Sequence, residues 1–235
     1  MIFDDIVIDE KCSHVKLDIG LSYNAPHSQI WLTHEPHLMV FGFEPNPDAN
    51  QAILSLDNKK RHPAHGEPLS NKFINEGRFK LYEVALGNTE KEEMMVLYVS
   101  KNDCGTSSLF KPQEKNIGPT EKLLNVPVLN LKMFFDRFPW DKVAYIDYIK
   151  IDAQGSDLNI LKGAGDYLRE RVVYVTAEPD GYQYHGANEC NVQNIQTYME
   201  SQNFVRVQHP YTKDPTFLNK KYEHLKRNIF ICQLS

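Results

Sequence analysis

Four acidic residues stand where apolar segments end, although these segments lie far apart in the chain. Asp18 occurs in "KLDIG", Glu44 in "FGFEP", Asp152 in "IKIDA" and Glu178 in "VTAEP". Carboxylates accept hydrogen bonds from hydroxyl and ammonium groups, and they also serve as general bases. A strand end reaches water in any case, so one such acid alone indicates little. Four of them together favour a shared binding site.

The segments that carry these acids read as strands, because helical patterns separate them. Apolar residues at helical spacing predict helices over about 25–35, 47–58, 156–168 and 191–202. Strands that alternate with helices predict an α/β fold, a mostly parallel sheet with helices on both faces. Ligands of such sheets lie beyond the carboxyl ends of the strands, so we expect the four acids to share one crevice.

Further segments predict strands and loops outside this set. Residues 78–86 and 94–100 alternate polar and apolar side chains, and the turn between them predicts a hairpin. Residues 57–77 and 111–125 read as loops, and the apolar run at 228–234 predicts a late strand. The pattern contains no internal repeat, and its length suits one α/β domain that spans the whole chain, 1–235.

The composition argues against nucleic acid and membrane partners. The chain has 26 basic and 31 acidic residues, a formal net charge of -5. A grip on phosphate backbones or anionic lipids needs a basic surface, and the one basic cluster, 58–65, reads as a solvated loop. The first residues lack the pattern of a signal peptide. No apolar run approaches the roughly 18 residues of a membrane span.

The cysteines and histidines indicate neither disulfides nor a metal site. Four cysteines are scattered without a C-x-x-C pair, which favours reduced thiols and a cytoplasmic protein. The pairs His34–His37 and His62–His65 are each interrupted by a proline, and no matching ligand cluster lies near them. We therefore predict no metal site. A divalent ion held by Asp152 and a neighbouring acid is the less favoured alternative.

The turn after the first predicted strand selects the kind of cofactor. It reads "DIGLSYNAPHS" and has one glycine, Gly20, so it lacks the G-x-G-x-x-G that seats a pyrophosphate. This disfavours a nicotinamide oxidoreductase. S-adenosylmethionine, which has a ribose but no phosphate, fits better. Glu44 would accept hydrogen bonds from two ribose hydroxyls, while Gly20, Ser22 and Asn24 would bind the amino-acid end, with Asp18 near its ammonium.

Five motifs in order give the chain a resemblance to the FkbM-type methyltransferases, which use S-adenosylmethionine. The motifs are "LDIG" (17–20), "FEPNP" (43–47), "VALGNTEKE" (84–92), "GTSSL" (105–109) and "IDYIKIDAQGSDLNILKGA" (146–164). The last motif is the most specific, and together they cover about residues 15–180. Where the family usually has a glutamate, this chain has Gln154. This departure leaves open a cofactor-binding partner module that no longer catalyses.

The resemblance implies a Rossmann-like class I methyltransferase fold. Such a fold has seven strands, with the last strand antiparallel and inserted beside the end of the sheet, a place that residues 228–234 would fill. It also implies a set of cofactor contacts: Asp18 and Gly20 at the amino-acid end, Glu44 with Asn46 of the same motif at the ribose, Glu83 and Ala85 near the adenine, and Ser107 and Asp152 along the wall.

The same resemblance points to O-methylation of a hydroxyl on a sugar, a glycan or a small metabolite. A hydroxyl acceptor must lose its proton, and a positioned base accelerates such a step by roughly 10² to 10⁴. Asp152 and Glu178 are the candidate bases, because neighbouring strand ends would bring them to the same opening of the binding site. His185 is the next candidate, since it lies in the loop that follows Glu178.

Overall fold

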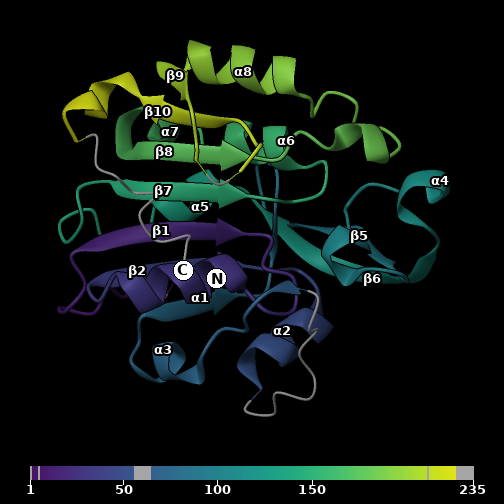
Figure 1. Cartoon of the computed structure of the whole chain (residues 1–235), viewed down its shortest axis with the longest axis horizontal. Helices are drawn as coiled ribbons and strands as arrows, with labels where there is room; N and C mark the ends of the chain where they lie inside the picture. Colours follow the sequence, from purple (N-terminus) through teal and green to yellow (C-terminus); the bar gives the residue numbers. More distant parts are fainter. Residues whose placement is uncertain (1, 5, 56–64, 211, 226–235) are drawn as a thin grey trace.

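The computed structural model describes residues 2–4, 6–55, 65–210 and 212–225. Its centre is a seven-stranded sheet in the order β3-β2-β1-β7-β8-β10-β9 (Figure 1). The strands are β1 (His14–Ile19), β2 (Leu38–Phe43), β3 (Phe79–Tyr82), β7 (Ile146–Ile151), β8 (Val172–Ala177), β9 (Phe204–Val207) and β10 (Thr216–Asn219). The first five strands in this order pair in parallel, and β10 is antiparallel to both of its neighbours.

Helices cover both faces of this sheet. The α-helices among the described residues are α1 (Pro26–His34), α2 (Pro47–Leu54), α3 (Asn71–Asn75), α4 (Glu114–Ile117), α5 (Leu131–Phe135), α6 (Asp157–Lys162), α7 (Asp166–Arg171) and α8 (Val192–Ser201), of which α4 lies beside the small sheet formed by β5 (Glu93–Ser100) and its neighbours. Three short 3-10 helices among the described residues are η3 (Cys104–Thr106), η4 (Gly181–Gln183) and η5 (Lys220–Leu225). In this described part of the chain, no helix is long and apolar enough to cross a membrane.

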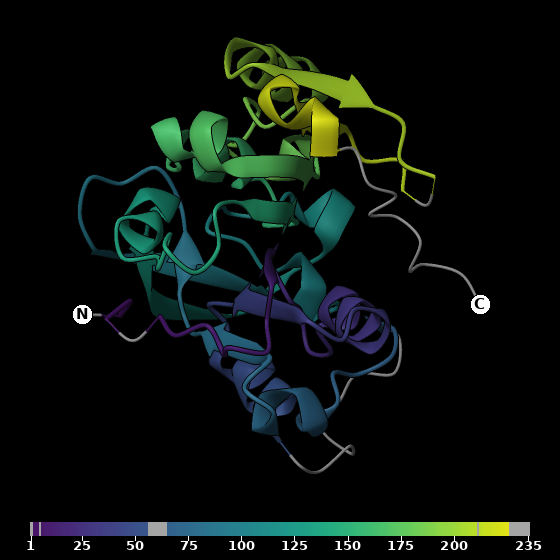
Figure 2. The same cartoon turned by 90° about the vertical axis from the view of Figure 1, so that its left-hand side faces the viewer.

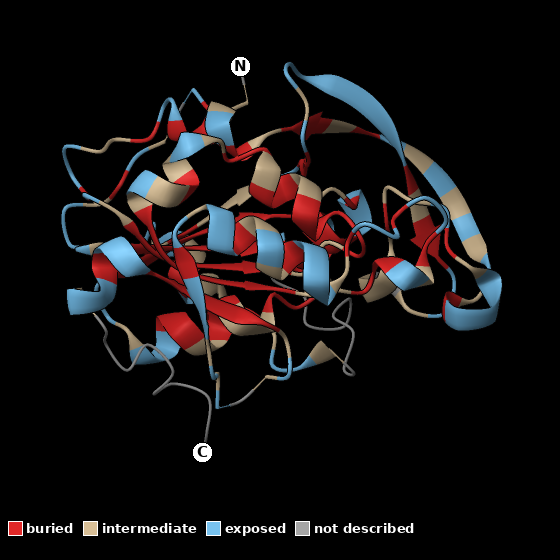
Figure 3. Ribbon diagram, turned by 90° about the horizontal axis from the view of Figure 1, so that it is seen from above, coloured by how far each residue is buried: buried red, intermediate tan, exposed pale blue. Residues whose placement is uncertain are grey.

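Two apolar cores pack against the two sides of the sheet. Side chains from α5 to α8 meet one face, where Leu17 of β1 and Phe41 of β2 are buried. Side chains from α1 and α3 meet the other face, where Val40 of β2 is buried. Figure 2 shows α1 on one side of the strands and α6 and α7 on the other, and Figure 3 shows buried residues concentrated in the central strands. The predicted α/β architecture is confirmed.

Local sequence signals account for where the site-forming helices begin. Pro26 and Pro47 occupy the first turns of α1 and α2, where the missing N–H of proline is not needed. The Asn46 side chain caps α2 by accepting a hydrogen bond from the Asp48 N–H at 3.1 Å. The helix predicted over 156–168 is two helices, α6 and α7, because Gly165 adopts a φ of +58° between them.

A second, three-stranded sheet corrects the predicted hairpin. Its order is β4 (Ala85–Leu86), β6 (Thr120–Leu129) and β5 (Glu93–Ser100), so β6 lies between the two segments that were expected to pair. Residues 78–86 form two strands, since β3 belongs to the large sheet and β4 to the small one. The loop predicted over 111–125 is also wrong in part, because it contains α4 and the start of β6. Polar–apolar alternation identifies a strand but not its partner.

The inserted antiparallel strand is β10, a four-residue segment that the sequence pattern did not single out. The strand predicted at 228–234 lies outside the described residues. Within the predicted loop at 57–77, residues 65–77 are described and contain α3.

Candidate functional site

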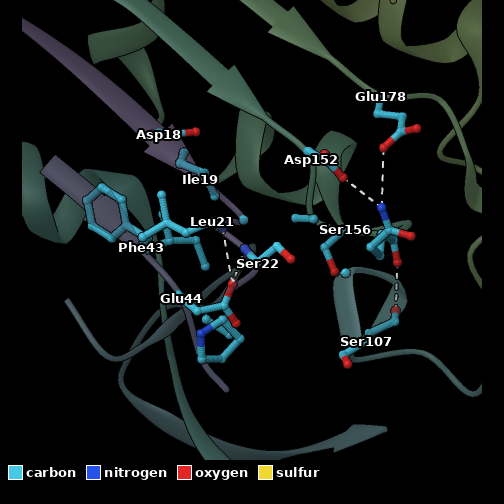
Figure 4. Close-up of a pocket in the computed structure, with 18 of the residues that line it drawn as sticks. Asp18, Ile19, Leu21, Ser22, Phe43, Glu44, Ser107, Asp152, Ser156 and Glu178 are labelled. Atoms are coloured by element: carbon cyan, nitrogen blue, oxygen red, sulfur yellow. Dashed lines mark hydrogen bonds between the residues drawn. The ribbon is translucent and has the colours of Figure 1, made fainter. Parts of the chain in front are cut away.

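A cavity of about 360 Å³ lies at the carboxyl ends of β1, β2, β7 and β8 (Figure 4). Residues from four distant parts of the chain meet there, as the parallel arrangement of these strands requires. Eight residues predicted for the site line the cavity: Asp18, Gly20, Ser22, Glu44, Ala85, Ser107, Asp152 and Glu178.

Gly20 allows three strand ends to approach one another closely. Its N–H donates to the Phe43 carbonyl at 3.0 Å, and the Asp152 N–H donates to the Ile19 carbonyl at 3.0 Å. Gly20 has a φ of +81°, and a Cβ at this position would lie 1.8 Å from the Asp152 carbonyl oxygen. A residue with a side chain would therefore separate β1 from β7 at the cavity wall.

Glu44 ends β2 and holds the turn that follows β1. Its Oε2 accepts hydrogen bonds from the Leu21 and Ser22 N–H groups, both at 3.1 Å, and its Oε1 accepts one from the Asn46 N–H at 2.9 Å. Burial raises the pKa of Glu44 to about 7, although these three backbone donors offset part of the effect. Each carboxylate oxygen has two lone pairs, so Glu44 can also accept from a bound hydroxyl.

Asp18 lines the cavity, and one of its two carboxylate oxygens has no hydrogen-bond donor among the described residues. Its Oδ2 accepts from the Ser28 N–H at 3.1 Å and from the Ser28 hydroxyl at 2.6 Å. Its Oδ1 is buried and has no hydrogen-bond partner among the residues that the structure describes. A buried carboxylate oxygen without a donor is unfavourable, so a ligand that offers an N–H or O–H here would gain by it.

Asp152 and Glu178, across the cavity from Glu44 (Figure 4), form one connected array with Lys150 and Gln154. The Lys150 Nζ donates to Asp152 Oδ2 at 3.1 Å and to the Gly20 carbonyl at 3.3 Å. The Gln154 Nε2 donates to Asp152 Oδ1 at 2.6 Å and to Glu178 Oε2 at 3.3 Å. The Gln154 Oε1 accepts from the buried Tyr184 hydroxyl at 2.5 Å. An amide can bridge two carboxylates in this way, whereas an ionised glutamate has no donor to offer.

The two acids of this array differ in charge. Burial would raise the pKa of Asp152, but the Lys150 ammonium and hydrogen bonds from Glu178, Gln154 and Lys150 lower it to about 2. Burial raises the pKa of Glu178, and the neighbouring Asp152 carboxylate raises it further. Asp152 is therefore the ionised member of the pair, and Glu178 takes up the proton.

His65 is a cavity-lining residue that the sequence pattern did not select for this site. Its Nδ1 lies 3.1 Å from the Ser22 hydroxyl, and its Nε2 lies 3.1 Å from Asp103 Oδ1. Gly105 makes room for the ring, because a Cβ there would lie 3.0 Å from His65 Cε1. The only signal in the sequence is a histidine in an unusually long loop, a kind of loop that often carries function. Its H-x-x-H partner, His62, lies outside the described residues.

Four residues predicted for the site are not among those that line the cavity. Asn24 donates to the Gly66 carbonyl at 2.7 Å, and Asn46 caps α2. Glu83 accepts from the Asn50 side chain at 3.3 Å. His185 is exposed, and its N–H donates to the Lys111 carbonyl at 2.8 Å. Their direct contact with a ligand stays a prediction.

Comparison with known proteins agrees with this geometry. The family model described as the methyltransferase FkbM domain matches residues 20–206, well over half of the chain. No curated protein matches the chain. The matched region contains most of the cavity wall, from the turn after β1 to the loop after β8. The chain therefore belongs to the FkbM methyltransferase family.

Proposed function

We propose that this protein is an S-adenosylmethionine-dependent O-methyltransferase. The observation that carries the proposal is the meeting of Asp18, Glu44 and Asp152 at one cavity at the carboxyl edge of the sheet. The strand order also supports it. Five parallel strands are followed by an antiparallel strand inserted before the last one, as expected for a Rossmann-like class I methyltransferase fold.

The residues present fit this cofactor. The unpartnered Asp18 Oδ1 suits the ammonium of its amino-acid end, and the Gly20–Ser22 turn supplies backbone groups beside it. Glu44 Oε1 has one acceptor position left for a ribose hydroxyl, rather than the two expected, while Ala85 and Leu97 offer apolar contacts for a base and Ser107 a hydroxyl. When bound, S-adenosylmethionine supplies a methyl group on a positively charged sulfur, ready for in-line displacement.

His65 is the general base that the geometry favours. When its Nε2–H donates to Asp103, its Nδ1 accepts a hydrogen bond from the Ser22 hydroxyl, and an acceptor hydroxyl would take the place of Ser22 there. An acceptor hydroxyl that reaches this side gives its proton to Nδ1, and the Asp103 carboxylate holds the ring and stabilises its positive charge. Asp152 is a weaker candidate, because its pKa of about 2 makes it a poor proton acceptor at neutral pH. His185 is exposed and not among the lining residues.

The proposed acceptor is a hydroxyl on a sugar, a glycan or a small metabolite, and the proposed place of action is the cytoplasm. The alternative is a partner module that binds the cofactor without transferring its methyl group. Gln154 is the residue that keeps this alternative open, since it replaces a candidate acid in the array with Asp152.

Calorimetry with S-adenosylhomocysteine tests the cofactor assignment. We expect micromolar binding that is strongly weakened in Glu44→Ala, and no binding of NADH. Binding of NADH instead would overturn the proposal in favour of an oxidoreductase. Transfer of a labelled methyl group to a mixture of cell glycans and metabolites then separates the enzyme from the partner module, because only the enzyme produces labelled product.

A further inference from the structure

A second cluster of chemically active side chains lies behind the cavity wall. Asp157 begins α6, Asp180 lies in the loop after β8, and Cys190 precedes α8. One ligand atom from each of these three residues lies within 4.8 Å of the other two. They are 0%, 4% and 2% exposed, respectively, so the cluster is separated from bulk water. None of the three lines the cavity described above.

Asp180 is the member of the cluster whose carboxylate lacks hydrogen-bond donors among the described residues. Both of its carboxylate oxygens are buried and have no partner with hydrogen-bond geometry among the described residues. The Gly155 N–H lies near enough to favour the charged carboxylate but does not meet that geometry. No ion pair to Asp157 or Asp180 occurs within the part of the chain that the structure describes. Lys150, the cation of the array described above, is paired with Asp152. Burial raises the pKa of Asp180 to about 7, so the charged form is costly unless a cation binds it, and a proton is the alternative.

The other two side chains are held in place by the backbone. Asp157 Oδ1 accepts from the Glu178 N–H at 2.9 Å, and its Oδ2 accepts from the Ala153 N–H at 3.2 Å. The Gly181 N–H donates to the Cys190 carbonyl at 3.0 Å, which fixes Cys190 beside Asp180. Each Asp157 oxygen retains a second lone pair. The three groups therefore converge before any ligand arrives, as in a prepared metal site.

From this geometry we propose that Asp157, Asp180 and Cys190 bind a zinc ion. A thiolate beside two carboxylates suits zinc, whereas magnesium and calcium prefer ligand sets made only of oxygen. Three protein ligands leave one position for water. On binding, the Cys190 thiol, which now donates to the Glu178 carbonyl at 3.7 Å, releases its proton to solvent, as do the carboxyl groups of Asp157 and Asp180 where they are protonated, and one sulfur–zinc and two oxygen–zinc bonds form. The ion would tie the loop after β8 to the start of α6, directly behind Glu178.

Metal analysis of the full chain, purified without chelators and without cofactor, tests this proposal. We expect one zinc ion per chain and, after exchange with cobalt, the charge-transfer absorption of a thiolate–cobalt bond. We also expect thermal unfolding at a lower temperature once a strong chelator has removed the metal. A zinc-free protein that binds neither zinc nor cobalt at micromolar concentration would overturn the proposal, and protons would then neutralise the carboxylates.

Variants identify the ligands. Asp180→Asn keeps the shape of the side chain and is expected to weaken zinc binding by about a hundredfold, as is Cys190→Ser. Cys12→Ser removes the other described buried cysteine and should bind zinc as the wild type does. If Cys190→Ser fails to fold, a variant that combines Cys12→Ser, Cys104→Ser and Cys232→Ser retains only Cys190. It should keep the cobalt absorption, and loss of the absorption there would exclude Cys190 as the ligand.

Discussion

Glu44 combines two tasks, because one carboxylate both holds the turn after β1 and faces the cavity. We expect Glu44→Gln to weaken binding of S-adenosylhomocysteine by about 1 to 2 kcal/mol, the worth of charge-assisted hydrogen bonds to a carboxylate. Calorimetry at pH 8 measures this difference. Glu93→Gln, an exposed change on β5, is the matched control and should bind as the wild type does. Unchanged affinity in Glu44→Gln would remove Glu44 from the ribose site.

The raised pKa of Glu44 leads to a prediction of how cofactor affinity depends on pH. The pKa of Glu44 is raised to about 7, so the carboxylate is mostly protonated below this pH and ionised above it. Only the ionised form keeps the remaining lone pair of Oε1 for a ribose hydroxyl, so affinity should rise as the pH increases through 7, roughly tenfold between pH 6 and pH 8. Asp152 stays ionised throughout this range and adds no slope of its own. In Glu44→Gln the part of the slope due to Glu44 should disappear, and an identical slope in both proteins would contradict the assignment.

The pairing of His65 with Asp103 leads to a prediction about kcat rather than about cofactor affinity. We expect His65→Gln to lower kcat by about 10² to 10⁴, because the acceptor hydroxyl loses its base. Asp103→Asn should lower kcat by a smaller factor and shift the pH profile, because an amide holds the ring but does not stabilise its charge. Steady-state kinetics over a range of pH, with the KM for the cofactor as an internal reference, measures both effects. Wild-type kcat in His65→Gln would show that another group takes the proton.

At the scale of elements, the junction of β1 with β7 depends on Gly20. We expect Gly20→Ala to lower the free energy of unfolding by more than about 3 kcal/mol, since its Cβ would overlap the Asp152 carbonyl. Gly77→Ala is the matched control. Gly77 has a similar φ of +69° but open space around it, so only the backbone strain of about 1 to 2 kcal/mol remains. Urea unfolding measures both variants, and equal losses would mean that the close approach at Gly20 contributes nothing.

The elements that frame the cavity were predictable because local patterns define them. The strand that carries or precedes each of Asp18, Glu44, Asp152 and Glu178 is almost entirely buried, and parallel pairing brings the strand ends together. The small sheet was not predictable in the same way. Its strand β6 pairs with both β4 and β5, and this choice of partner depends on contacts between distant segments that alternation does not encode.

The site residues also fall into those that a local pattern predicts and those that contacts between distant segments place. Residues at strand ends reach the cavity as predicted, whereas Asn24, Asn46 and Glu83 sit close to these ends in sequence but support neighbouring loops and helices. His65 reaches the cavity through a long loop and meets Asp103 of another loop. No spacing in the sequence relates these two residues, because loops carry no periodicity.

At the scale of the whole molecule, the two sheets share one core. The main apolar cluster includes Leu86 of β4 and Leu129 of β6 together with strands of the large sheet. We therefore expect the chain to unfold in a single cooperative transition. Trp31 and Trp140 report on the two faces of the large sheet, so Trp31→Phe and Trp140→Phe each leave one probe. In each variant, urea curves from fluorescence and from circular dichroism should coincide, and separate midpoints would contradict a single unit.

The insertion of β10 between β8 and β9 has a consequence for how the protein is synthesised. Among the described residues, Glu178 is the last along the chain to line the cavity, whereas β9 pairs only with β10, which ends at Asn219. A nascent chain therefore has every described cavity-lining residue outside the ribosome some forty residues before the edge of β8 is covered. During this interval the growing polypeptide exposes the unpaired edge of β8. A ligand that binds in the cavity at this stage would stabilise the incomplete sheet until β9 and β10 have been synthesised.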